Sequence, residues 1–366
     1  MYAHILPLAA LLLGPVNPVT GGSPRDTSGE RADEERHWYT PLNGSVTLES
    51  YVGIGTFAAN DKADAPFYLA TLYLDPSWSL SENLSVAAQL WVSHEFTNLV
   101  TGCSPATGPR PDEGPQRDCS DTGEQNGRRT DVTDLAFTIN HGDLFGLIGL
   151  DALGTRLSVS TGVALPTSRA SRGARNLFTW TAAAQVSRSF GPVTPSLGTT
   201  LWKFFPRARA PKLPTNDPNQ DGVPVRNCAS FRAGQCILLP GFVSNFQWGL
   251  DASVNVDVGA IDGLSATISF GYLYSRSFGT GGDAFSSPLR DSEGRRVVDG
   301  VNESDTTSGT IDISYQITDT LSASAGVFSL QPARTADGRQ IRFPFYDFVS
   351  PANNFTGWYL SVSHSL

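Results

Sequence analysis

The feature that most constrains this chain is an alternation of apolar and polar side chains from Val243 to Val258. Phe246, Trp248 and Leu250 fall on one side of this pattern, and polar residues such as Asp251 fall on the other. A period of two places the two sets on opposite faces of a β-strand. These sixteen residues exceed the usual length of a strand in a globular protein. They fit a tilted strand that crosses a bilayer and extends beyond it.

The same alternation recurs from residue 44 to the end of the chain, in runs that are separated by turns. The composition agrees with an all-β chain, because 36 Gly, 24 Pro and a single Met are typical of turn-rich rather than helical proteins. The pattern predicts about twelve strands, with ten or fourteen as alternatives. We place the strands at 44–58, 66–80, 84–97, 131–141, 155–168, 177–190, 193–206, 242–260, 264–278, 304–318, 321–333 and 355–366.

The connections between these strands alternate in length. Those after even-numbered strands are short, such as SENL, GPV, AIDG and TDT, whereas those after odd-numbered strands include 98–130, 207–241, 279–303 and 334–354. The segment 141–154 breaks the rule, and it predicts either a short periplasmic helix or strand ends that are displaced by a few residues. Short turns on one side and long polar loops on the other are typical of outer-membrane barrels. A β-sandwich has no reason to separate its loops in this way.

The last strand carries a further resemblance. In FTGWYLSVSHSL the alternate positions from Trp358 to Leu366 form an outward, mainly apolar set that His364 interrupts. This segment resembles the C-terminal signal of outer-membrane β-barrel proteins, although members of that family mostly end in Phe. The resemblance covers 44–366 and implies an all-β, transmembrane, antiparallel up-and-down barrel in the bacterial outer membrane. It also implies outer-membrane lipid and the barrel-assembly machinery as partners.

The N-terminal segments differ from the rest of the chain. An apolar core from Ile5 to Leu13 is followed by small and turn-forming residues, so 1–22 is interpreted as a secretory signal peptide. It contains neither Lys nor Arg, which leaves a buried first strand as the alternative. Residues 23–43 are charged and aperiodic and predict a periplasmic lead-in, which leaves 44–366 as the barrel domain.

The charge of the chain limits its partners. A formal net charge of −9 and a sequence pI near 5.0 argue against a nucleic-acid surface, which needs clustered Lys and Arg. The alternation predicts more acids than bases on the inward face, with Arg276 as an inward base. The predicted lumen-facing acids are Glu49, Glu95, Asp134, Asp251, Asp257 and Asp312.

Four cysteines form two pairs that are close in sequence, Cys103 with Cys119 and Cys228 with Cys236. Each pair lies in a long loop assigned to the outer side, and neither spacing matches a C-x-x-C motif. We expect two loop disulfides formed in an oxidising compartment, with free thiols as the alternative. An unreduced digest analysed by mass spectrometry should contain both linked peptides, and crossed pairs or free thiols would contradict the prediction.

One loop contains part of a calcium-binding pattern. Asp217, Asn219 and Asp221, followed by a glycine, match the first half of an EF-hand-type loop. Cys228 stands at the twelfth position, where that motif has a bidentate Glu. The segment 207–241 is therefore a candidate calcium site, with an ordinary turn as the alternative, and the sequence indicates no other cofactor.

Several aromatic residues lie near the ends of the predicted strands. Aromatic residues near strand ends can form interfacial girdles. They are Tyr51, Trp78, Trp91, Trp180, Trp202, Trp248, Tyr274 and Trp358.

Outer-membrane phospholipases set His and Ser two residues apart on one outward face, and none of the five His here has a Ser at that offset. We therefore do not expect an enzyme.

These observations favour an outer-membrane diffusion channel or transporter for small solutes that mildly favours cations. A second interpretation is a structural or adhesive barrel whose acids hydrogen-bond within a filled lumen and whose extracellular loops carry the function. An outer-membrane lipid hydrolase is the third. A barrel of about twelve strands lies between the filled eight-stranded barrels and the open sixteen-stranded porins.

Overall fold

The computed structural model describes residues 42–55, 67–96, 129–148, 154–168, 171–172, 176–207, 244–278, 303–333 and 355–366. Its strands and helix are β1 (Leu42–Gly55), β2 (Phe67–Ser79), β3 (Leu84–Glu95), β4 (Arg129–Val132), β5 (Leu135–His141), α2 (Leu144–Leu147), β6 (Thr155–Leu165), β7 (Asn176–Arg188), β8 (Val193–Pro206), β9 (Ser244–Asp257), β10 (Leu264–Ser277), β11 (Glu303–Gln316), β12 (Leu321–Pro332) and β13 (Phe355–Ser365).

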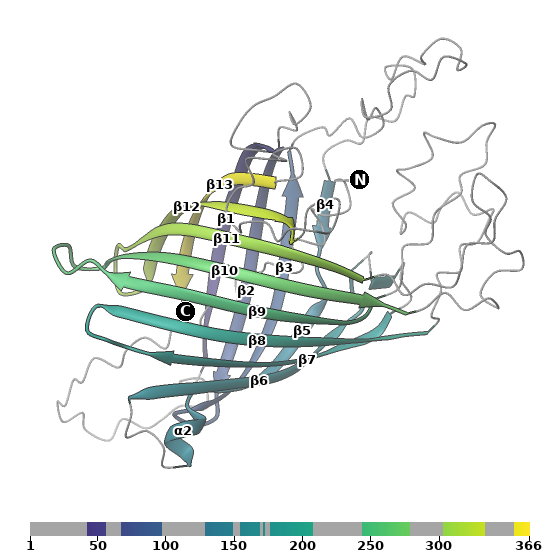
Figure 1. Cartoon of the computed structure of the whole chain (residues 1–366), viewed down its shortest axis with the longest axis horizontal. Helices are drawn as coiled ribbons and strands as arrows, with labels where there is room; N and C mark the ends of the chain where they lie inside the picture. The colour runs from purple at the N-terminus through teal and green to yellow at the C-terminus, as the bar shows by residue number, and fades with distance from the viewer. Residues whose placement is uncertain are drawn as a thin grey trace, which may run out of the picture.

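The strands close into one antiparallel barrel. Consecutive strands pair with each other except β4 and β5, and β13 pairs with both β12 and β1. β4 and β5 both pair with β3 and together take the place of one interrupted strand, so the barrel has twelve strands. In Figure 1 the strands β6 to β11 cross in front of β1, β2 and β3, and β13 lies beside β12. The predicted twelve-stranded barrel is confirmed, with strand ends displaced by only a few residues.

The contact between β1 and β13 closes the barrel. Its register runs from Ser45 opposite Ser365 to Val52 opposite Trp358. On the inner face the hydroxyl oxygens of Thr47 and Ser363 lie 2.8 Å apart. The exterior face of the same strand pair is mainly apolar. Because every strand has two neighbours, the barrel has no open edge at which backbone groups would face lipid.

The two faces of the barrel differ in polarity. Large apolar side chains are more than half exposed on the exterior, including Leu48, Leu197, Ile268, Ile313 and Leu360. The inner face carries polar side chains, among which Thr71 and Gln247 are each 2% exposed. A mainly apolar exterior around a closed, polar interior is the arrangement of outer-membrane barrels. The chain is accordingly a bacterial outer-membrane β-barrel that presents its exterior to lipid.

The short connections all lie at one end of the barrel, which we name the periplasmic rim, and the opposite end is the outer rim. The short connections are 80–83, 189–192, 258–263 and 317–320. At the same rim Asp143 caps α2 by accepting a hydrogen bond from the Gly146 amide at 3.1 Å. Of the two alternatives for the segment 141–154, a short helix or displaced strand ends, the structure has the short helix. No helix in the described ranges is long and apolar enough to cross a membrane.

Candidate functional site

One side of the lumen carries tyrosines and carboxylates that project from β1, β2, β11 and β13. The hydroxyl of Tyr359 on β13 donates a hydrogen bond of 2.8 Å to Asp312 Oδ2 on β11. Tyr359 reaches across β12 at Gly326, which pairs with both residues. A Cβ atom at Gly326 would lie 2.7 Å from Tyr359 Cε1, so the contact depends on the absence of a side chain there.

Two further tyrosines cover Glu49, Tyr51 on the same strand, β1, and Tyr73 on the neighbouring β2. Glu49 pairs with Thr71, and Tyr51 and Tyr73 lie on the rows immediately to either side. The hydroxyl oxygens of Tyr51 and Tyr73 are 3.1 Å apart, so the two phenols meet across the row of Glu49. This arrangement leaves Glu49 only 8% exposed. We name Glu49, Tyr51, Tyr73, Asp312 and Tyr359 the tyrosine–carboxylate wall.

Part of the opposite side of the lumen, around Asp251, carries smaller residues. Asp251 on β9 pairs with Gly198 on β8, and its carboxylate occupies the space that a side chain at Gly198 would fill. Nearer the periplasmic rim the hydroxyl oxygens of Ser196 and Ser253 lie 2.6 Å apart. Around Asp251 the inner face therefore carries smaller residues than the side with the tyrosines.

The other acids predicted to face the lumen lie closer to the rims. Asp257 is the last residue of β9, at the periplasmic rim, and Glu95 is the last residue of β3, at the outer rim. Asp134 accepts a hydrogen bond of 2.8 Å from the Ser168 amide and another from the Ser171 hydroxyl. Its carboxylate therefore holds the segment after β6 at the outer rim.

The prediction that Arg276 faces the lumen is wrong. Arg276 pairs with Phe246 and Glu303, and it continues the exterior face of Tyr272 and Tyr274. Its Nε lies 3.5 Å from Glu303 Oε1. The register shifts only after Arg276, so the alternation that puts the two tyrosines outside also puts this arginine outside.

Three of the aromatic residues that were predicted to form interfacial girdles lie inside the barrel instead. In the lumen the hydroxyl of Tyr51 meets the hydroxyl of Tyr73, and the ring centroids of Trp91 and Tyr73 are 5.2 Å apart. Trp202 lies over Gly249 on the inner face. Trp180, Trp248 and Trp358 are on the exterior, with exposed fractions between 36% and 60%. Strand parity separates these two groups, whereas closeness to a strand end does not.

The sequence analysis did not single out Asp75 or the tyrosines as lumen residues. Asp75 lies on β2 in the same parity as Thr71 and Tyr73, and it faces Gln89 and Trp91 on β3. The alternation of side chains along β2 indicates that Asp75 and Tyr73 face inward. The residue type of a tyrosine does not indicate this, because tyrosine occurs on both the lipid-facing and the lumen-facing sides of barrels.

Several predicted sites lie outside the described residues. These are Cys103, Cys119, Cys228 and Cys236 and the calcium candidates Asp217, Asn219 and Asp221. Their disulfides and metal binding remain predictions. Within the described ranges there is no group of three or more His, Cys, Asp or Glu side chains that could hold a metal ion.

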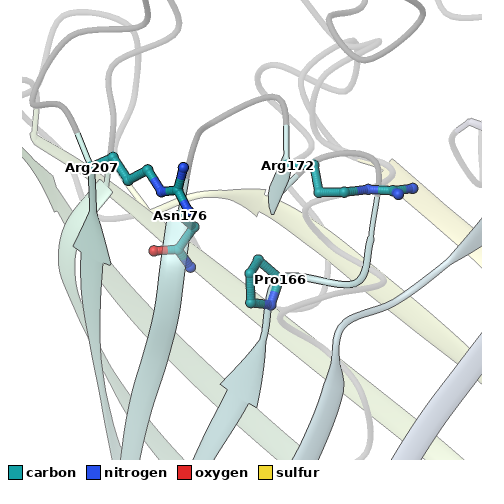
Figure 2. Close-up of a pocket in the computed structure, with 4 residues that line it drawn as sticks. All are labelled: Pro166, Arg172, Asn176 and Arg207. Carbon is teal, nitrogen blue, oxygen red and sulfur yellow. The ribbon is translucent and has the colours of Figure 1, made fainter.

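A pocket of about 460 Å³ lies at the outer rim, where β6, β7 and β8 end. It is lined by Pro166, Arg172, Asn176 and Arg207. Figure 2 shows the guanidinium of Arg207 beside Asn176, while the side chain of Arg172 extends away from both. Because the two arginines do not converge, we place the candidate functional site in the lumen rather than in this pocket.

Comparisons with known proteins were made for the whole chain. No protein-family model matches it, and no curated protein matches it. Similar solved structures include an outer membrane channel from Pseudomonas putida F1, with 13% identity and a TM-score of 0.48 over 92% of this chain and 100% of that chain. The NanC porin has 8% identity and a TM-score of 0.40 over 89% and 100%. The outer membrane channel DcaP of Acinetobacter baumannii has 12% identity and a TM-score of 0.31 over 89% and 96%.

Proposed function

We propose that this chain is an outer-membrane channel that passes small solutes and favours cations. The observation that carries the proposal is the excess of acids over bases at inward positions of the described strands. The inward acids are Glu49, Asp75, Glu95, Asp131, Asp251, Asp257 and Asp312. The bases at inward register positions are Arg156, near the periplasmic rim, and Arg129, opposite Glu95.

The preference for cations follows from the electrostatics of a narrow passage. Carboxylates on its wall lower the energy of a passing cation and raise that of an anion. The low dielectric of the surrounding protein and lipid keeps these fields from being screened as fully as they are in bulk water. Acids at several depths, such as Asp251 near the middle of β9 and Asp257 at its end, extend the effect along the lumen.

The second candidate is a barrel with a filled lumen whose outer loops carry the function. It is favoured by the tight packing of part of the inner face, where Gln247 is 2% and Tyr73 is 5% exposed. Conductance separates the two candidates. A planar bilayer that stays sealed after insertion of the refolded wild-type protein would support the filled barrel and contradict the channel.

The selectivity prediction uses three single substitutions that each remove one charge. Under a salt gradient we expect Asp251→Asn and Asp312→Asn to shift the reversal potential toward anions more than Asp257→Asn does. A unit charge about 7 Å from a permeating ion in water is worth about 0.6 kcal/mol, or about a threefold change in the permeability ratio. At the periplasmic rim, salt screens the charge of Asp257 more strongly.

The same measurement can contradict the proposal. Unchanged reversal potentials in Asp251→Asn and Asp312→Asn would mean that neither carboxylate lies along the path of the ions. An anion preference in the wild type would also contradict it. Asp319→Asn, in the turn 317–320 at the periplasmic rim, is the control for a change in net charge outside the lumen.

A further inference from the structure

We propose that the tyrosine–carboxylate wall binds the primary ammonium group of small organic cations, and that Glu49 is the carboxylate that receives it. The inference deepens the proposed channel function, on which it rests for the route by which a solute enters the lumen. It names a class of solute and a position at which that solute pauses.

The first observation concerns the burial and the hydrogen-bond partners of the Glu49 carboxylate. Its side chain points into the lumen and is 8% exposed. No described residue donates a hydrogen bond to its carboxylate, although a buried carboxylate normally has such donors or a cationic partner. The carboxylate of Asp312 also acts on Glu49 electrostatically and repels it. Among the described side chains, Glu49 therefore has a second carboxylate beside it and no cationic partner.

The second observation is the set of rings around this carboxylate. Tyr51 and Tyr73 meet across the row of Glu49 with their hydroxyl oxygens 3.1 Å apart. The ring centroids of Tyr51 and Tyr359 are 6.0 Å apart, and Phe328 meets the Tyr51 ring edge to face at 5.5 Å. The faces of aromatic rings carry partial negative charge and attract cations. Rings and carboxylates thus favour a cation at the same place.

The chemistry of the site selects an ammonium group. An ammonium has three N–H donors, which can supply hydrogen bonds that no described residue donates to the Glu49 carboxylate. Asp312 already accepts a hydrogen bond from Tyr359, so it contributes mainly a second negative charge. A charge-assisted hydrogen bond to Glu49 and the attraction of the tyrosine rings would act on the ammonium together.

The size of the cationic group and the number of ligands that a metal ion needs both argue against other cations. Because Glu49 is only 8% exposed, a small head group can reach it more easily than a bulky quaternary ammonium, which also has no N–H donor. Calcium takes six to eight oxygen ligands. The described residues contain no cluster of three or more His, Cys, Asp or Glu that could hold a metal ion.

The test measures the binding of propylammonium chloride to the full-length refolded protein in detergent micelles, by saturation-transfer NMR. We expect saturable binding to the wild type and at least about a tenfold weaker binding to Glu49→Gln, the loss associated with a hydrogen bond to a charged group. Glu49→Asp keeps the charge and should bind more tightly than Glu49→Gln. Glu82→Gln, in the turn 80–83, is the matched control and should bind as the wild type does.

Competing probes test the chemical class. Neutral 1-propanol and tetraethylammonium chloride should bind more weakly than propylammonium. Equal binding of 1-propanol would show that the charge is not recognised, and equal binding of tetraethylammonium would show that the N–H donors are not. Displacement of propylammonium by an equal concentration of calcium chloride would indicate a metal site. Each of these results, or wild-type binding by Glu49→Gln, would overturn the inference.

Conductance separates this inference from the channel proposal. A sealed bilayer together with Glu49-dependent binding in micelles would refute the channel and retain the ammonium site. A conducting channel in which Glu49→Gln binds propylammonium as the wild type does would retain the channel and refute the site. If both stand, propylammonium should reduce the single-channel current of the wild type more than that of Glu49→Gln.

Discussion

Replacement of Leu360 by arginine is expected to lower the free energy of unfolding of the barrel by about 2–4 kcal/mol. Leu360 lies at the middle of β13 between Ser50 and Ala325, and its side chain is 65% exposed on the exterior. In the hydrocarbon core a guanidinium loses most of its hydration. Chemical unfolding in lipid vesicles, followed by the different gel mobility of unboiled folded protein, measures the change.

The control for this prediction is the same substitution at the end of the same face. Leu366 is 61% exposed, but it lies at the periplasmic rim, where an arginine is expected to cost about 0–1 kcal/mol. Equal losses at Leu360 and Leu366 would mean that the middle of β13 does not face the hydrocarbon core.

The second large effect is expected for Gly326→Ala, which should cost about 1–3 kcal/mol through overpacking. The new Cβ would lie 2.6 Å from the Ile311 carbonyl oxygen and 2.7 Å from Tyr359 Cε1. Relief of the second contact would move the tyrosine away from Asp312 and weaken their hydrogen bond. The free energy of unfolding in lipid vesicles is again the measurement.

Two comparisons isolate the cause of this effect. At Gly259, in the turn 258–263, an added Cβ has no atom within 4 Å, so Gly259→Ala should be close to neutral. In a Tyr359→Ala background the contact with the ring is absent and Gly326→Ala should cost less, which a double-mutant cycle measures. The same cost in both backgrounds would place the strain at the other two close contacts of the new Cβ, the Ile311 carbonyl oxygen and Asp312 Cβ.

Much of the fold could be predicted from the sequence because a membrane barrel obeys two simple rules. Side chains alternate between lipid and lumen, and the connections alternate between short turns and long loops. Together these rules located all twelve strands and the exceptional segment that holds α2. The division of one strand into β4 and β5 was not predicted, since both parts pair with β3 and the sequence between them resembles an ordinary strand.

Less of the candidate site could be predicted. Parity alone placed Glu49, Asp251 and Asp312 among the candidates, but it does not show which side chains of different strands meet on the inner face. The hydrogen bond between Tyr359 and Asp312 spans β12 and depends on Gly326, and the contact of Tyr51 with Tyr73 depends on the register of β1 with β2. These contacts arise from strand pairing between distant segments, which the local sequence pattern does not contain.

The pairing of β1 with β13 also has a consequence for biogenesis. Thr47 and Ser363, whose hydroxyls meet at this junction, are 316 residues apart in sequence, so this contact has one of the largest closure costs in the chain. A chain without β13 would leave two unpaired strand edges, and lipid offers no hydrogen-bond partners for them. Completion of the ring therefore acts as an intrinsic checkpoint for an intact chain, because a truncated product cannot reach the same stable state in the membrane.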